Sequence, residues 1–201
     1  PKFNLFMIRN TLGIFRKKVA IDVKEGEYLG KTGGKDKPAV FDFALFDYRN
    51  PRHTYTDKER WTNFGNTFEQ AFYVTCPLNY FPDTIRVKAE SRLGTDYKKR
   101  ATEPVCGEVF QDIEGTARGV WFSDSNQQGK QISLVYDAAE PEKLVFAIGE
   151  GYESIKYGDY FFVPQKTGFV NTDFRQVVPD KIFCFDKLKD KREQTLDGKI
   201  L

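Results

Sequence analysis

Short apolar segments separated by turn residues constrain the fold of this chain more than any other feature. The segments are rich in aromatic and β-branched residues, which suit the pleated, half-buried surface of a sheet. The clearest of these predicted strands are residues 39–46, 131–136, 144–148, 160–163 and 181–185. Many short strands at this spacing are typical of a barrel or a sandwich of antiparallel strands. The predicted fold class is therefore mainly β, with one or two short helices.

Residues 83–93 carry the clearest helical pattern in the sequence. Ile85, Ala89 and Leu93 recur at a spacing that places them on one face of a helix. Asp83 stands at the N-cap position, and Gly94 stands where a glycine often ends a helix. We therefore predict a helix over residues 83–93 with one apolar face.

The composition changes between residues 49 and 65, which are polar and aromatic without a strand pattern. We predict a linker or irregular segment there. A capping-box pattern at Thr56 and Glu59 predicts a second short helix running toward Phe68. The segment would separate a barrel-like β module at 1–48 from a second β module at 66–201.

The charge balance argues against a polyanionic partner. Lys and Arg number 31 and Asp and Glu number 29, which gives a net charge of +2. Such a chain has no long-range field that would attract nucleic acid. Two basic clusters, Lys98–Arg100 and 187–192, are predicted to be a solvated turn and a fraying end.

No apolar run approaches the roughly 18 residues that cross a bilayer, so we predict no membrane span. The chain begins at Pro1 without the residue order of a signal peptide. We expect that it has been trimmed from a longer chain.

The chain holds three cysteines, Cys76, Cys106 and Cys184. None of them belongs to a C-x-x-C pair and no histidine lies near them in the sequence, so a zinc site is not predicted. We predict a disulfide between Cys76 and either of the other two cysteines. The odd count leaves one free thiol.

Histidine carries much of the acid–base chemistry and metal binding in proteins near neutral pH. This chain has one, His53, which we predict to be exposed in a loop. No nucleophile-elbow, phosphate-loop or dinucleotide-binding motif occurs. The sequence therefore favours a non-catalytic protein without metal or cofactor.

Carboxylates are plentiful, and they leave a second function open. Asp42 interrupts the apolar run at 39–46, and we expect it to face outward. Glu108 and Asp112 are close enough in sequence to meet in the fold. A hydrolase that uses paired carboxylates is therefore the alternative to a binding module.

Residues 111–122 contain the best candidate ligand site. Asp112, Arg118 and Trp121 stand among small residues: glycine permits close backbone approach, arginine offers a planar donor fork, and tryptophan offers a stacking face. These are the parts of a site for a sugar or a carboxylate. The same residues also suit a tight turn and a core strand in which Trp121 is buried.

Residues 23–33 read V-K-E-G-E-Y-L-G-K-T-G, and the apolar run at 39–46 follows them. Over about residues 18–48 the chain resembles a lysostaphin-type zinc endopeptidase barrel, in which such a hairpin precedes a His-x-His strand. The hairpin is also similar to one in lipoyl-like barrels. Phe41-Asp42-Phe43 stands where the histidines would be, so the resemblance implies a degenerate barrel without zinc or peptidase activity. Elsewhere the chain resembles uncharacterised bacterial proteins, through residues 76–81 and 115–122.

The resemblance also implies a setting in the bacterial cell envelope, either periplasmic or secreted. Together with the residues above, it predicts a non-catalytic binding or structural β module. The ligand would be a glycan or a cell-wall peptide held near Arg118 and Trp121. A third alternative is that the chain is a fragment of a larger envelope protein whose active half is missing.

Overall fold

The chain divides into two compact units, Pro1–Phe43 and Ala44–Leu201. The computed structural model describes residues 2–5, 8–10, 13–15, 19–22, 24, 26–28, 43–51, 53, 55–57, 70–95, 98–123, 131–150, 152 and 155–196. Residues 30–42, which hold Asp42 and half of the predicted strand at 39–46, lie outside these ranges. The predicted helix toward Phe68 also lies largely outside them.

The first unit contains two antiparallel pairs of short strands. Strand β1 (Lys2–Leu5) pairs with β4 (Val19–Asp22), and β2 (Ile8–Asn10) pairs with β3 (Gly13–Phe15). Sequence-adjacent β2 and β3 form a local hairpin, as expected for strands joined by a short connection.

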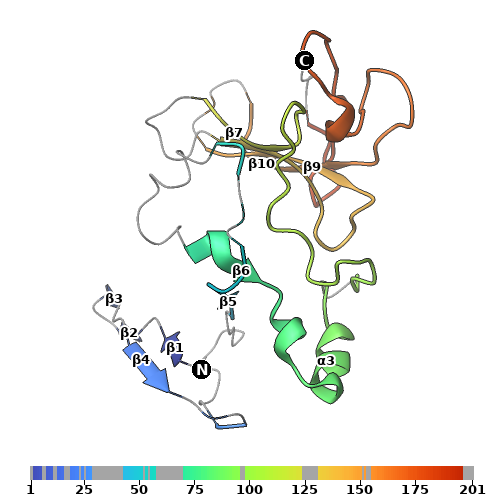
Figure 1. Ribbon diagram of the computed structural model, residues 1–201. Helices are drawn as coiled ribbons and strands as arrows, with labels where there is room; N and C mark the ends of the chain where they lie inside the picture. Colours follow the sequence, from blue (N-terminus) through green and yellow to red (C-terminus); the bar gives the residue numbers. More distant parts are fainter. Residues whose placement is uncertain are drawn as a thin grey trace. The chain divides into compact units, whose positions relative to one another are not determined.

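The second unit is built around a four-stranded antiparallel sheet (Figure 1). Its strands are β7 (Gly119–Phe122), β8 (Gln131–Tyr136), β9 (Leu144–Ile148) and β10 (Gly158–Phe162). They lie in the order β10-β9-β8-β7, so each strand pairs with its neighbour in sequence. The antiparallel β class is confirmed. Among the described residues no sheet closes on itself, so the predicted barrel or sandwich is not confirmed.

The core lies where one face of this sheet meets the C-terminal segment. Strands β9 and β10 contribute alternate apolar side chains, among them Phe146 and Phe162, because a strand turns every second residue to the same face. From the C-terminal segment, Phe174 and Leu188 are 0% and 1% exposed. The ring of Phe174 lies 5.5 Å from that of Phe162 and 5.4 Å from that of Phe185, measured between centroids.

The predicted strand at 181–185 is wrong in its hydrogen bonding, although its apolar pattern is real. Phe183 and Phe185 are buried in the core. The backbone makes only an isolated bridge, with Cys184 donating to Phe169 O at 2.8 Å and accepting from Asn171 N at 2.8 Å. Alternating apolar residues require burial of one side of an extended chain, but they do not require a neighbouring strand.

The predicted helix is observed as α3 (Asp83–Glu90), which is shorter than expected. Pro82, not Asp83, is the N-cap residue. The predicted apolar face is not a core face, because no residue of α3 is buried and Ile85 is 48% exposed. Gly94 does not end the helix: it has φ +121° and pairs with Lys99, and a Cβ there would clash with the carbonyl oxygen of Lys98.

Short connecting elements lead to and from α3 and the sheet. Strand β5 (Leu45–Phe46) pairs with β6 (Val74–Thr75), and the 3₁₀ helices are η1 (Gln70–Tyr73), η2 (Pro77–Tyr80) and η3 (Phe174–Gln176). Within the described ranges, no helix is long and apolar enough to cross a membrane.

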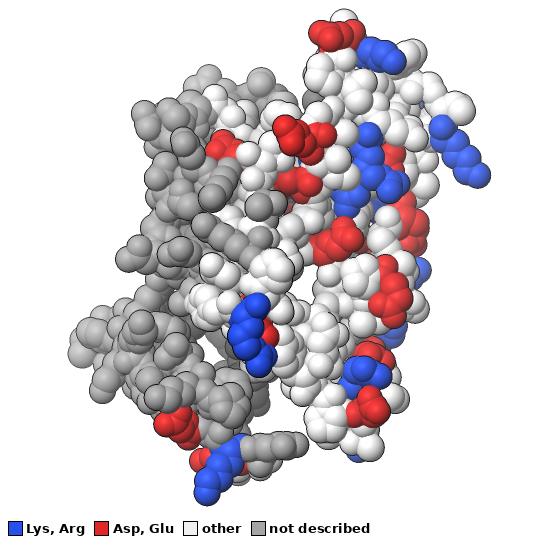
Figure 2. All heavy atoms as spheres, in the orientation of Figure 1, with Lys and Arg blue, Asp and Glu red and all other residues white. Residues whose placement is uncertain are grey.

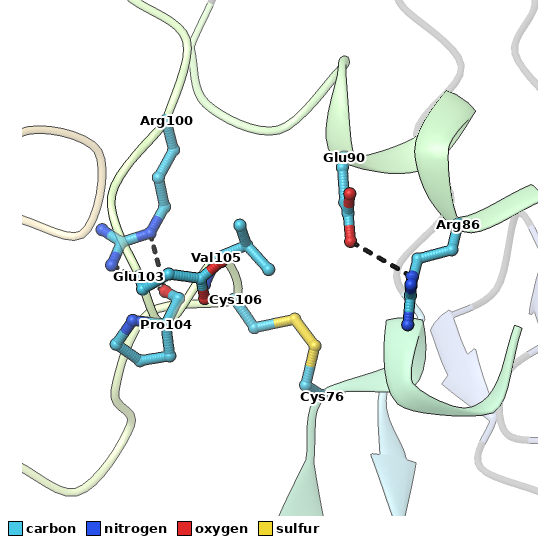
Figure 3. Close-up of a disulfide and its surroundings, with 8 residues drawn as sticks. All are labelled: Cys76, Arg86, Glu90, Arg100, Glu103, Pro104, Val105 and Cys106. Atoms are coloured by element: carbon cyan, nitrogen blue, oxygen red, sulfur yellow. Dashed lines mark hydrogen bonds and ion pairs between the residues drawn. A yellow bond between two sulfur atoms is a disulfide. The ribbon is translucent and has the colours of Figure 1, made fainter. Parts of the chain in front are cut away.

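Cys76 and Cys106 form a disulfide, which decides between the two pairings that the sequence left open (Figure 3). The bond joins the start of η2 to the loop after residue 100. Cys184 is a free, partly exposed thiol.

The two basic clusters are solvated only in part: Lys98, Lys99 and the basic side chains of 187–192 are exposed, as predicted, but each cluster also holds a buried residue. Arg100 is 8% exposed, and its Nη2 donates to the carbonyl oxygen of Pro104 at 2.8 Å beside the disulfide (Figure 3). Its Nη1 donates to Ala138 O. In the 187–192 cluster Leu188 is buried, and Lys189 exchanges two backbone hydrogen bonds with Phe161. The charge pattern did not reveal these long-range contacts.

Candidate functional site

The predicted ligand residues lie on the loop 108–118 and on β7, at one edge of the four-stranded sheet. The loop is closed on itself by a hydrogen bond of 3.1 Å from Ile113 N to Arg118 O. Ala117 N donates to Val177 O at 2.8 Å, which attaches the loop to the C-terminal segment. The loop therefore has a fixed conformation before any ligand binds.

Asp112 fastens this loop to two other segments. Its Oδ2 accepts a hydrogen bond of 3.1 Å from Thr56 N, and its Oδ1 accepts one of 3.3 Å from Val120 N on β7. A Cβ at Gly119 would lie 2.8 Å from Asp112 Oδ1, so the close approach requires the glycine, which has φ +140°. Asp112 thus satisfies backbone donors, and both of its oxygens are already engaged.

Burial raises the pKa of the Asp112 carboxyl group above its ordinary value, with a smaller contribution from the charge of Asp57. The two backbone hydrogen bonds act in the opposite direction but do not cancel the effect of burial. The folded protein therefore holds the Asp112 proton more tightly than the unfolded chain does.

This pKa shift predicts how stability depends on pH. Between the ordinary aspartate pKa of about 3.9 and the raised native pKa, the folded state binds more protons, so the stability contributed by this group falls as pH rises and is constant above that window. We expect Asp112→Asn, which cannot titrate, to become more stable relative to the wild type as pH rises through the window. Urea unfolding of both proteins between about pH 4 and pH 7 measures this. A difference that does not change with pH would contradict the raised pKa.

Arg118 is packed into the protein. Its side chain is 9% exposed and its guanidinium carbon lies 4.5 Å from the ring centroid of Tyr136. Its Nη2 donates to Gln111 Oε1 at 3.2 Å and lies 3.4 Å from Glu108 Oε2. The buried Nε has no hydrogen-bond partner among the described residues. Arg118 therefore packs between the loop 108–118 and Tyr136 of β8, and its side chain is not open to a ligand.

Gln111 and Tyr136 complete this support, and sequence reasoning did not single them out. Gln111 Oε1 accepts a hydrogen bond of 2.9 Å from Tyr136 N. Gly119, the first residue of β7, pairs with Leu134 of β8, so Tyr136 lies past the end of β7 and has no partner on that strand. The side-chain amide of Gln111 accepts the hydrogen bond from Tyr136 N in place of a neighbouring strand. Burial and the neighbouring Glu108 carboxylate raise the pKa of Tyr136 to about 12. No local pattern could have identified a contact between residues this far apart.

Trp121 is the predicted site residue that remains accessible. Its side chain is 51% exposed, so the interpretation of Trp121 as a buried core residue is wrong. Its indole Nε1 donates to Ala117 O at 2.7 Å, which fixes the ring against the loop. The structure therefore presents a half-exposed aromatic ring in a defined orientation.

The predicted carboxylate pair is not joined by any contact in the described chain. Glu108 lies against Arg118, whereas Asp112 binds Thr56 and Val120. His53 is exposed as expected, with its Nε2 at 3.1 Å from Val74 O and its ring stacked 4.2 Å from that of Phe110. Over the described ranges, no group of three or more His, Cys, Asp or Glu residues could hold a metal ion.

Comparison with protein-family models, with curated proteins and with solved structures finds no match for this chain. Its function therefore has to be argued from the geometry alone.

Proposed function

We propose that this protein is a non-catalytic β module that binds a glycan- or peptide-like ligand on the indole of Trp121. The observation that carries the proposal is that this ring is 51% exposed although its only polar atom, Nε1, is already bonded to Ala117 O. A ligand gains contact with the face of the ring without paying the entropy of ordering the side chain. A glycan fits best, since the C–H face of a sugar ring can stack on an indole.

In this proposal the indole of Trp121 is the binding platform, and Arg118 and Asp112 hold it in position instead of touching the ligand. Asp112 holds β7 at Val120, and Arg118 packs beneath the loop that carries Ala117. Ala117 in turn fixes the indole of Trp121. The paired-carboxylate hydrolase has no comparable support, because Glu108 and Asp112 are each engaged with other groups.

We further propose that the first unit, Pro1–Phe43, forms a degenerate barrel and that the protein works in the cell envelope, periplasmic or secreted. The hairpin motif at 23–33 and the antiparallel pairing of β1 with β4 support the first part. The Cys76–Cys106 disulfide supports the second, because disulfides persist in oxidising compartments. Phe41 and Phe43 have no atom that could bind zinc.

Tryptophan fluorescence tests the Trp121 platform directly, because the chain contains only one other tryptophan, Trp61. We expect a saturable change when wild-type protein is titrated with cell-wall glycan fragments. The change should persist in Trp61→Phe and disappear in Trp121→Phe. Stacking is worth about 0.5 to 1.5 kcal/mol, so Trp121→Ala should weaken binding about two- to twelvefold by calorimetry.

Tyr157 supplies a matched control, because it is an exposed aromatic residue (64%) outside β7 and the loop 108–118. Tyr157→Ala should leave glycan affinity unchanged. Wild-type affinity in Trp121→Ala, or equal losses in the two variants, would contradict the proposal. A response to peptide fragments but not to glycans would keep the site and change the ligand.

A further inference from the structure

A pocket of about 530 Å³ lies at the end of the sheet where β8 leaves for β9. Its lining comes mainly from the turn 137–143, from residues 161–163 and from residues 187–193, with Thr95 and Asn171, and none of it comes from the segment 108–122. The volume lies in the range of roughly 300 to 1,000 Å³ that holds small molecules. The pocket is therefore separate from the Trp121 platform.

Both walls of the pocket are tight turns closed by an aspartate. Asp137 Oδ1 accepts hydrogen bonds of 2.7 Å from the backbone N–H groups of Ala139 and Glu140. Asp190 Oδ1 accepts hydrogen bonds from Arg192 N at 2.8 Å and Gln194 N at 2.9 Å. These hydrogen bonds hold the walls in place without a ligand.

The second wall is also attached to the sheet. Phe161 N donates to Lys189 O at 2.7 Å, and Lys189 N donates to Phe161 O at 3.2 Å. Leu188, 1% exposed, anchors the same segment in the core. A ligand would therefore meet a preformed site, which lowers the entropic cost of binding.

Four lysines line the pocket, and three of them already have an acidic partner. Lys143 lies 3.0 Å from Glu140, Lys189 lies 2.9 Å from Glu193, and Lys191 lies 3.7 Å from Asp159, which is outside the pocket. Lys187 makes no ion pair or side-chain hydrogen bond with any residue that the structure describes. Its ammonium group is thus the cation in this lining that is open to a ligand anion.

The remaining lining restricts the charge and the shape of the ligand. Asp137, Glu140, Asp190 and Glu193 balance the four lysines, so the pocket as a whole is close to neutral. A neutral pocket with one open cation suits a single negative charge and offers no second open cation to a dianion. The lining also includes apolar surface from Phe161, Phe162 and Val163. Acidic and basic side chains are likewise intermixed on the face of the molecule that Figure 2 displays.

We propose that this pocket binds a small monocarboxylate with an apolar body, its carboxylate on Lys187 and its apolar part against Phe161 and Val163. Two sources share this chemistry: a free N-acylated amino acid and the C-terminus of a peptide. Both present one carboxylate next to an apolar side chain. Charge-assisted hydrogen bonds from an ammonium to a carboxylate are among the stronger polar contacts available to such a ligand.

The test is calorimetric titration of the full chain with N-acetyl-phenylalanine, with N-acetyl-phenylalanine amide and with phenyl phosphate. We expect the acid to bind and the amide and the phosphate to bind about tenfold more weakly or not at all. A tripeptide ending in phenylalanine with a free carboxyl group separates the two sources: it binds as well as the acetylated amino acid if the pocket accepts a chain end.

Lys187→Gln should weaken binding of N-acetyl-phenylalanine about tenfold, and Lys187→Arg should retain most of it. Val163→Glu should abolish binding by placing a negative charge on the apolar side. Val163 is 64% exposed, so we expect its replacement to leave the fold intact, which the melting temperature checks.

Lys181→Gln is the matched control, an exposed lysine of the same C-terminal segment outside the pocket, and it should bind as the wild type does. Trp121→Phe should also bind normally, which separates this site from the glycan platform. The proposal is overturned if the acid does not bind, if the amide binds equally well, or if folded Lys187→Gln keeps wild-type affinity.

Discussion

Replacing Phe174 with alanine is expected to destabilise the protein by about 3 to 5 kcal/mol. The side chain is 0% exposed and its ring meets those of Phe146, Phe162 and Phe185 at centroid distances of 6.2, 5.5 and 5.4 Å. Alanine would leave a cavity where the C-terminal segment joins the sheet. Urea unfolding measures the loss, which is a large part of a typical total stability of about 5 to 15 kcal/mol.

Two variants make this prediction specific to the cavity. Phe174→Leu fills more of the space and should lose clearly less stability than Phe174→Ala. Phe169→Ala removes a ring of the same size that is 55% exposed, and it should cost less than about 1 kcal/mol. Equal losses in Phe169→Ala and Phe174→Ala would show that the buried aromatic cluster does not hold the C-terminal segment in place.

Removing the disulfide is expected to cost about 3 to 4 kcal/mol. Cys76 and Cys106 are separated by 30 residues, and closing a loop of that length restricts the unfolded chain by about this amount in the chain-entropy treatment. The double variant Cys76→Ser/Cys106→Ser avoids an unpaired thiol at this site. Its free energy of unfolding should be compared with that of the wild type under oxidising conditions.

Reduction provides an independent check of the same bond. Wild-type protein unfolded in excess dithiothreitol should resemble the double variant, whereas the double variant should not respond to dithiothreitol. Cys184→Ser is the control, because Cys184 is a free thiol, and its stability should still depend on the reductant. If dithiothreitol left the wild-type stability unchanged, the bond would not contribute to folding.

The strands were predictable where each apolar pattern is local. The segments at 131–136 and 144–148 are observed as β8 and β9 with the predicted bounds. Residues 131–136 alternate in polarity, which is typical of a half-buried strand, whereas 144–148 is a continuous apolar run, and four of its five residues are buried in β9. The same rule failed at 181–185, where Phe183 and Phe185 are buried but the backbone bonds go to the turn near Asn171. The apolar pattern of a segment indicates which of its side chains are buried. It does not indicate which other segment accepts or donates its backbone hydrogen bonds.

The helix shows a similar division between local and distant information. Residue types near Asp83 favour a helix there, and α3 begins at that residue. The spacing of Ile85, Ala89 and Leu93 places them on one face, but Ile85 is 48% exposed and the other two are only partly buried. Helical periodicity shows that a face exists, whereas burial depends on whether another element packs against it.

The candidate site divides in the same way. The sequence identified Trp121 as a stacking surface and Arg118 as a donor, because those properties belong to the side chains themselves. It could not show that Arg118 would be 9% exposed over Tyr136, or that Trp121 would be tied to Ala117 and half-exposed. Exposure of a side chain is set by segments that are distant in sequence.

The sequence by itself determined the β class, the balance of charge, the single histidine and the lack of known catalytic motifs. These follow from composition and from patterns a few residues long. Only the tertiary structure decided that Cys76 pairs with Cys106, that Arg100 is buried, and that Lys187 lines a pocket without an ionic partner in the described chain. Each of these depends on contacts between residues that are distant in the sequence. Whether such contacts form depends on how the whole chain packs, which no local sequence pattern specifies.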